Sequence, residues 1–447
     1  MKRIRATTLA EAFWTLDPFG LVHPDDPWHC DVEARFDPTR YGLIAPITRR
    51  LAPQKGRPDF VHLGVVGHKG TGKTTQVRKA MANLSAKGIE PIFIDALASV
   101  DQADLSFPDL ILVISRGVVN ALNEVGADVP GEERELVKLW FAEELLTETH
   151  RKEILGTLEA EAKASVGVSF LAKLTAKVTA VLRSDNEYRR EIRRRAERDP
   201  IELVRRANFL LDAATTALSN KRSRPCTLAV VVDNLEKLAD RRQIDAAILR
   251  RADDLRRLRC HLVLFFDPAD QYAPSTVQAG QAFDVVTVPM LPIRERADQA
   301  NHVADPALET IKELLDKRVD LEKIFASVPE SLRTVVQFSG GRLRDVLHLA
   351  RLACELADPD RVTPGHVVAA ARRLKGERLT LATPGHWRRL AEIHRDKQVA
   401  NDPSDAYLLL HSLVLNYDSD PWWDVHPLVR LDTRFDMAWK TLSPIAT

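Results

Sequence analysis

Residues 67–74 constrain the fold of this chain more than any other segment. They read GHKGTGKT, follow the apolar run 60–66 and precede a stretch with helical spacing. The glycines let the backbone curl until its N–H groups point at one anion, and the N-terminal end of the following helix adds positive charge. This order of strand, glycine-rich turn and helix predicts a phosphate-binding loop in an α/β sheet. A glycine-rich turn with no chemical role is the alternative.

The polar residues of this loop predict a nucleoside triphosphate and its metal ion as the ligand. The Lys73 ammonium would hold the β- and γ-phosphates, and the Thr74 hydroxyl would ligate Mg²⁺. We therefore expect ATP and Mg²⁺ as the cofactors. The predicted nucleotide-binding residues of the loop are Gly67, His68, Lys69, Gly70, Thr71, Gly72, Lys73, Thr74 and Thr75.

A second candidate site follows a buried strand. Residues 227–232 read TLAVVV, an apolar run that suits a strand covered on both faces. Asp233 comes next and resembles a Walker B carboxylate, which would hold Mg²⁺ opposite Thr74; an Asp that caps a helix is the alternative. Many ATPases place a Glu directly after this Asp to orient the attacking water, but this chain has Asn234 there. Glu236 is the candidate that would reach the water from the loop, and without it hydrolysis would be slow.

The order of the expected elements predicts the fold class and the domains. Strands alternate with helices up to residue 288, and the pattern is helical from residue 304 to about 374. We predict an α/β fold: a P-loop NTPase parallel sheet with a helical insertion, then a helical lid domain and a small C-terminal, winged-helix-like domain. The C-terminal Trp422 and Trp423 are expected to pack in a hairpin near 418–423 rather than to stack on bases. The expected ranges are 1–55 for a leader that packs on the ATPase core, 56–295 for the ATPase domain with its insertion at about 130–225, 296–376 for the lid, and 377–447 for the C-terminal domain.

Composition bears on partners and location. The 447 residues include 64 basic and 63 acidic ones, and this balance argues against a surface that is basic throughout and binds nucleic acid by its charge. Scattered cysteines, and the lack of any apolar stretch of roughly 20 residues, predict a cytoplasmic protein that does not enter a membrane. The arginine-rich stretch 189–198 carries interleaved glutamates, which favours a solvated, ion-paired helix face; a nucleic-acid or partner contact is the alternative.

Further features resemble the additional-strand class of P-loop ATPases, which includes AAA+ and STAND-like proteins. The strand expected at 89–94 precedes the second motif, which implies that the two motif strands lie apart in the sheet. Arg344 matches the Gly-x-x-Arg at the start of a lid helix, whose Arg reports on the γ-phosphate in those proteins; a helix start with exposed arginines is the alternative. The stretch 260–293 holds no Arg or Lys where AAA+ rings carry an arginine finger, and Asp267 replaces the usual sensor Asn, Thr or Ser. These departures favour a nucleotide switch over a ring motor.

Segments spread over nearly the whole chain resemble one bacterial family of STAND/AAA+-like P-loop ATPases: DPFGLV, GHKGTGKTT, VVVDNLEKL, SGGRLRDVL and WWDVHPLV. Similar ATPases are regulatory partners in conflict or anti-phage systems. The resemblance implies a slowly hydrolysing regulatory ATPase that works with a separate protein effector; a homo-oligomer is a further possibility, since the nucleotide-bound surface could recruit another copy. The expected catalytic residues are Lys73, Asp233, Glu236 and Arg344, of which Arg344 would also bind the nucleotide. Two alternatives stay open: a DNA-handling ATPase of the origin-recognition or transposon target-selection type, with DNA a less favoured partner, and a scaffold that keeps ATP without hydrolysis.

Overall fold

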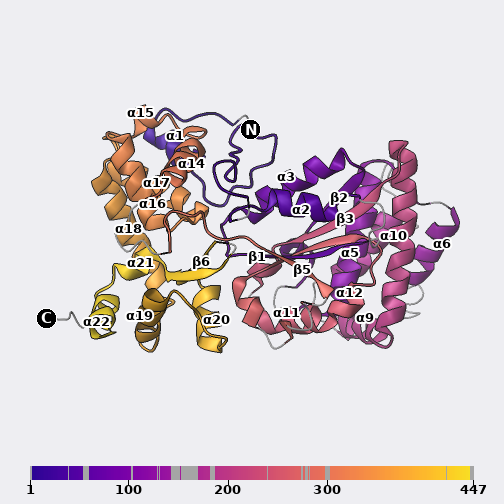
Figure 1. Ribbon diagram of the computed structural model, residues 1–447. Coiled ribbons are helices and arrows are strands. Elements are labelled where there is room, and N and C mark those ends of the chain that lie inside the picture. Colours follow the sequence, from indigo (N-terminus) through magenta and orange to yellow (C-terminus); the bar gives the residue numbers. More distant parts are fainter. Residues whose placement is uncertain are drawn as a thin grey trace.

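The computed structural model describes residues 3–442 except 39, 54–59, 102–103, 128, 130, 142–151, 153–169, 182–186, 239, 273–274, 277–279, 281, 297–302 and 419. The predicted boundary at 55–56 and part of the predicted insertion lie outside the described residues. In Figure 1 the sheet domain and its insertion lie on one side, and the helical and C-terminal units lie on the other. The N-terminal leader contacts both sides.

Five parallel strands form the sheet, in the order β2-β3-β4-β1-β5. Strands β1, β3 and β4 are almost wholly buried, as a parallel sheet covered on both faces requires. Strand β4 lies between β1 and β3, so the two motif strands are separated, as the sequence predicts. Because all five strands run in one direction, the loop after β1 and the turns after β3 and β4 share one edge of the sheet. The bounds are β1 (His62–Val66), β2 (Ile89–Asp95), β3 (Thr227–Asp233), β4 (His261–Phe266) and β5 (Asp284–Thr287).

Helices cover both faces of the sheet (Figure 1). The apolar side chains of α2 and α3 share one core with β1, β3 and β4. Helices α5, α10, α11 and α12 share a second core with the opposite side chains of β3 and β4, since successive residues of a strand point to opposite faces. The predicted fold class is confirmed for this domain. The bounds are α2 (Ile44–Leu51), α3 (Lys73–Ser85), α5 (Phe107–Glu124), α10 (Pro200–Arg222), α11 (Arg241–Ala247) and α12 (Ala252–Leu255).

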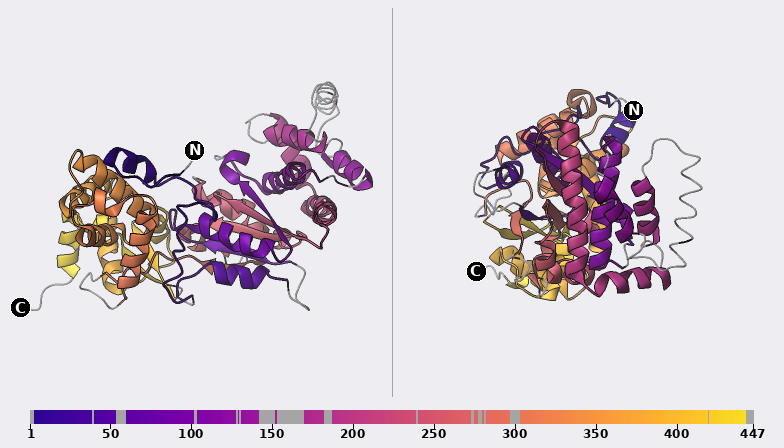
Figure 2. Two further views of the ribbon diagram at one scale, coloured as in Figure 1. Left: turned by 90° about the horizontal axis from the view of Figure 1, so that it is seen from above. Right: turned by 90° about the vertical axis from the view of Figure 1, so that its right-hand side faces the viewer.

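The regular elements that the structure describes between β2 and β3 are helices, as predicted for the insertion. Helices α5 and α10 cover the sheet, whereas α6, α8 and α9 lie beyond them, on the side away from the helical unit (Figure 2). Arg189 and Arg193 of α9 turn inward and pair with acidic residues that precede or begin α5, namely Asp101, Asp104 and Asp109. Part of the arginine-rich stretch is therefore an internal ion-pair network. The remaining bounds are α4 (Ala96–Ser99), α6 (Gly131–Leu139), α8 (Phe170–Val181) and α9 (Glu187–Glu197).

The helical unit has a core of its own, to which the leader contributes. Ala12 and Leu16, in and just after α1, are fully buried in this core, and Ala6 forms a bridge with Val319. The sequence predicts a leader that packs on the sheet domain; α2 packs there, whereas α1 packs on α17 of the helical unit through these apolar side chains. The bounds are α1 (Leu9–Thr15), α14 (Asp305–Asp316), α15 (Leu321–Ile324), α16 (Val328–Ser339), α17 (Leu343–Ala357) and α18 (Pro364–Leu379).

The C-terminal unit contains the expected hairpin, formed by antiparallel β6 and β7. Tyr417 stacks on Trp422 with ring centroids 4.6 Å apart, and both side chains lie in the core of the helical unit. Trp422 is therefore a packing residue, and its ring is not exposed for base stacking. None of the described helices combines the length and the apolar character needed to cross a membrane. The bounds are α19 (His386–Asp396), α20 (Pro403–Leu410), β6 (Val414–Tyr417), β7 (Trp422–Val425), α21 (Pro427–Arg430) and α22 (Thr433–Leu442).

Candidate nucleotide site

The loop between β1 and α3 has a conformation that needs its glycines. Gly70 has a φ of 90°, in the left-handed region that favours glycine. A Cβ on Gly70 would lie 2.6 Å from Cβ of Arg344, and a Cβ on Gly67 would lie 2.7 Å from the carbonyl oxygen of Val288. The loop is thus both curled and closely approached by its neighbours, as expected of a backbone cradle for phosphate.

Lys73, the first residue of α3, lies buried against this loop. Its Nζ donates to the carbonyl oxygens of Gly67 at 2.5 Å and His68 at 2.8 Å, and lies 3.9 Å from Oε1 of Glu236. Burial lowers the pKa of Lys73, and the carboxylates of Glu236 and Asp267 oppose this shift. The glycine loop and Glu236 therefore hold a buried ammonium group at the start of α3.

The predicted metal ligands, Thr74 and Asp233, are in contact. Thr74 Oγ1 donates to Oδ1 of Asp233 at 3.0 Å. Burial raises the pKa of Asp233, and the charge of Glu236 adds to this, so a cation at this carboxylate would be stabilising. Among the described residues, no group of three His, Cys, Asp or Glu side chains could hold a metal by itself. The pair fits Mg²⁺, which is usually bound by one or two protein groups together with waters and substrate phosphates.

The turn after β3 places Glu236 beside Lys73, whereas the Asn234 side chain bonds to the end of β2. Asn234 has a φ of 67°, and its Nδ2 donates to Oδ1 of Asp95 at 2.8 Å, which holds this side chain at the end of β2. The chain then forms the 3-10 helix η2 (Leu235–Lys237). Glu236 is only 4% exposed, and its Oε2 has no hydrogen-bond partner in the described part of the chain. That oxygen can accept a hydrogen bond from a group in the cavity that Glu236 lines.

The helical unit contacts the loop at the start of α17. Nε of Arg342 donates to the carbonyl oxygen of Lys69 at 2.7 Å, and the backbone N–H of Arg344 donates to that of Gly70 at 3.1 Å. The Arg344 guanidinium lies 5.3 Å from the ring centroid of Phe19. Burial lowers the pKa of Arg344, and the charge of Arg342 adds to this. A second unit thus places a partly desolvated cation at the loop.

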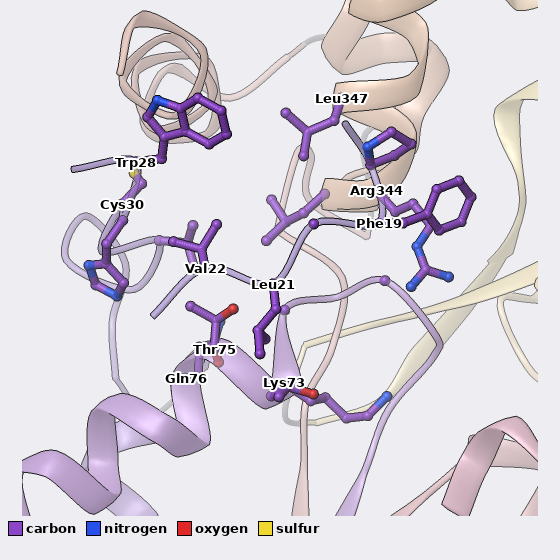
Figure 3. Close-up of a pocket in the computed structure, with 18 of the residues that line it drawn as sticks. Phe19, Leu21, Val22, Trp28, Cys30, Lys73, Thr75, Gln76, Arg344 and Leu347 are labelled. Atoms are coloured by element: carbon purple, nitrogen blue, oxygen red, sulfur yellow. The ribbon is translucent and has the colours of Figure 1, made fainter. Parts of the chain in front are cut away.

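One cavity of about 360 Å³ joins these groups (Figure 3). Its polar lining includes Lys73, Thr74, Asp233, Glu236 and Arg344. The rest is mainly apolar and comes from the leader and the helical unit, including Phe19, Leu21, Val22, Trp28 and Leu347. These wall residues were not predicted from the sequence, where the available signal was a leader rich in aromatic residues that prolines prevent from forming a long helix.

Four residues of the predicted binding loop do not line the cavity: Gly67, His68, Lys69 and Thr71. His68 is fully buried, and burial lowers its pKa well below the usual value; the backbone of Leu409 in α20 lies beside it. Thr71 Oγ1 donates to the carbonyl oxygen of His68 at 3.1 Å. These four residues therefore shape the loop from behind the cavity, and the His68 side chain is buried beside the C-terminal unit.

No family model matches this sequence, and no curated protein matches it. The chain is similar to solved structures along most of its length. They include the Orc1 protein of Aeropyrum pernix in complex with DNA (15% identity, 96% of each chain, TM-score 0.37), the ORC2 protein of Aeropyrum pernix in ADPNP-ADP complexes (11%, 96% of this chain and 98% of that one, 0.42) and a Walker-type ATPase of Pyrococcus abyssi (13%, 88% and 96%, 0.39). At these identities and TM-scores the similarity assigns no activity, ligand or partner to this chain.

Proposed function

We propose that this chain is a regulatory ATPase that binds Mg-ATP and hydrolyses it slowly. The observation that carries the proposal is that Lys73 of the sheet domain and Arg344 of the helical unit line one cavity, with Thr74 and Asp233 also in its wall. Two cations suit a polyphosphate, and the Thr–Asp pair suits its Mg²⁺. The apolar part of the cavity offers room for a base.

A nucleotide in this cavity would bridge two units of the chain. Arg342 and Arg344 already bond to loop carbonyls, and a γ-phosphate near Arg344 would add a charged contact that ADP lacks. A ligand shifts a conformational equilibrium only through its different affinity for the two states. We therefore expect ATP to hold the helical unit on the loop more firmly than ADP does, and the resulting surface to recruit a partner or another copy of the chain.

Hydrolysis is assigned to Glu236 as the group that orients the attacking water. Lys73 and Mg²⁺ would neutralise charge on the transferred phosphate. The carboxylate lies 3.9 Å from Lys73, with one oxygen lacking a partner among the described residues, which supports this role. It comes from a turn rather than from the residue directly after Asp233, which supports slow turnover.

The favoured partner is a separate protein effector, because the sequence contains no second recognisable catalytic motif. A role in anti-phage defence, a homo-oligomer and a cytoplasmic location rest on the sequence analysis alone. DNA handling is the second candidate, since Arg190, Arg194 and Arg198 are exposed on or beside α9. The inward pairing of Arg189 and Arg193 reduces the basic face and favours protein.

Steady-state ATP turnover, with and without double-stranded DNA at low salt, tests the proposal. We expect tight Mg-ATP binding and turnover well below about one per second, unchanged by DNA. Lys73→Ala should abolish binding, while Lys87→Ala, an exposed lysine just after α3, should behave as the wild type. Turnover raised by DNA would favour DNA handling, and bound ATP without turnover would favour a scaffold. Unchanged ATP binding in Lys73→Ala would refute the nucleotide site itself.

A further inference from the structure

One arginine outside the cavity holds the turn that carries Glu236. Arg241 begins α11, and its Nη1 donates to the carbonyl oxygens of Leu235 at 3.4 Å, Glu236 at 3.1 Å and Leu238 at 3.1 Å. The turn is a three-residue 3-10 helix, which has few hydrogen bonds of its own. The guanidinium therefore supplies much of what fixes the backbone under Glu236.

The same guanidinium is anchored on its other side by a buried carboxylate. Nε and Nη2 of Arg241 donate to the two oxygens of Asp270 at 2.8 and 2.6 Å, a bidentate pair. Asp270 lies in the 3-10 helix η4 (Pro268–Tyr272), is 4% exposed, and accepts from the backbone N–H of Asp267 at 2.8 Å. Asp267 directly follows β4, the strand between β1 and β3. Arg241 thus ties the turn after β3 to the end of the central strand.

We propose that Arg241 is a positioning residue for Glu236 in ATP hydrolysis, an inference that rests on the proposed function. Arg241 is not among the residues that line the cavity, whereas Glu236 is. It would act through the backbone of residues 235–238, because a shift of that turn moves the carboxylate away from Lys73. A displacement of about 1 Å at a reacting group can cost on the order of 100-fold in rate.

This geometry separates the effect on hydrolysis from the effect on binding. Nucleotide affinity depends on Lys73, Thr74 and the loop backbone, so loss of the Arg241 side chain should leave it nearly unchanged. The rate of hydrolysis depends on where Glu236 lies and should fall. Arg241→Lys keeps a charge near Asp270, but an ammonium lacks the planar fork that bonds to Asp270 and to the turn together, so it should restore only part of the rate.

The test compares Arg241→Gln and Arg241→Lys with Arg242→Gln in the full chain. Arg242 is the matched control, since its side chain is 92% exposed and pairs with Asp240. The measurements are the Kd for Mg-ATP, the single-turnover hydrolysis rate and the melting temperature. We expect Arg241→Gln to lower the rate at least about tenfold with Kd within about threefold, and the control to match the wild type. A wild-type rate, or equal losses in rate and affinity, would overturn the proposal.

A double-mutant cycle distinguishes positioning from a general loss of stability. Glu236→Gln removes the group that Arg241 is proposed to place, so adding Arg241→Gln should lower the rate little further. If the double variant lost rate by the product of the two single-variant factors, the residues would act independently and the proposal would be overturned. If Arg241→Gln does not fold, Arg241→Lys and Asp270→Asn take its place in the same cycle.

Hydrogen exchange gives a measurement that does not need turnover. Amides of residues 235–238 should exchange faster in Arg241→Gln than in Arg242→Gln, because the turn loses its external donors. Equal exchange in the two variants would overturn the positioning role. If the wild-type chain binds ATP but does not hydrolyse it, the proposed ATPase function fails, while the exchange result still decides whether Arg241 holds the turn.

Discussion

Gly70→Ala should separate the helical unit from the glycine loop. A φ of 90° at this position costs an L residue about 1–2 kcal/mol in the left-handed region. The new Cβ would also lie 2.6 Å from Cβ of Arg344, and overpacking of this kind costs about 1–3 kcal/mol. Because Cβ of Arg344 is fixed to the start of α17, relief requires the helical unit to move away. The native state, in which the loop keeps this φ and α17 packs on it, is therefore penalised by roughly 2–5 kcal/mol in total.

The assay is equilibrium binding of Mg-ATP, with the free energy of unfolding measured in parallel. Each tenfold change in Kd corresponds to about 1.4 kcal/mol, so the lower end of this penalty, about 2 kcal/mol, predicts a Kd for ATP weaker by roughly 30-fold. Gly376→Ala is the control: its Cβ would meet nothing within 4 Å and it lies in α18, so the free energy of unfolding should rise by about 0.5–1 kcal/mol with binding unchanged. If Gly70→Ala binds ATP and unfolds as the wild type does, the close approach of Arg344 to Gly70 is refuted.

Three further predictions concern the charged groups around the loop. Asp233→Asn should raise the Mg²⁺ concentration needed for ATP binding, and an unchanged Mg²⁺ titration would remove Asp233 from the site. Arg344→Gln should weaken ATP binding while leaving ADP affinity nearly unchanged; equal losses for the two nucleotides would contradict a γ-phosphate contact. Burial, together with the charge of Asp270, raises the pKa of Asp267 from 3.8 to about 7. Between these two pH values the folded state therefore binds more protons than the unfolded state does. The free energy of unfolding of the wild type should consequently fall as the pH rises from about 4 to 7. Asp267→Asn cannot ionise, so it avoids the cost of a buried charge at high pH. The difference in unfolding free energy between this variant and the wild type should therefore favour the variant more at pH 8 than at pH 4. A difference that does not change with pH would refute the raised pKa of Asp267.

The sequence by itself determined the sheet, the glycine loop and the order of the units. These features are encoded locally: a β-branched run such as residues 227–232 predicts a buried strand, and GHKGTGKT between a strand and a helix predicts a phosphate loop. The separation of the motif strands was predicted from their resemblance to a known class, and the sheet order confirms it. Such local patterns predict secondary structure correctly because the spacing of apolar residues within each helix or strand is the same before and after the elements pack together.

The sequence assigned Lys73, Thr74, Asp233, Glu236 and Arg344 to one site, but only the tertiary structure decided how they are held and what completes the cavity. Glu236 lies near Lys73 because Asn234 adopts a positive φ and Arg241 holds the next turn, and neither condition can be read from the spacing of the residues. The leader lines the cavity because its apolar side chains pack on the helical unit, more than 250 residues later in the chain. In the same way Arg189 is internal because it meets Asp101, 88 residues earlier in the chain. Such contacts join residues far apart in sequence, and they depend on how whole units pack rather than on any local pattern.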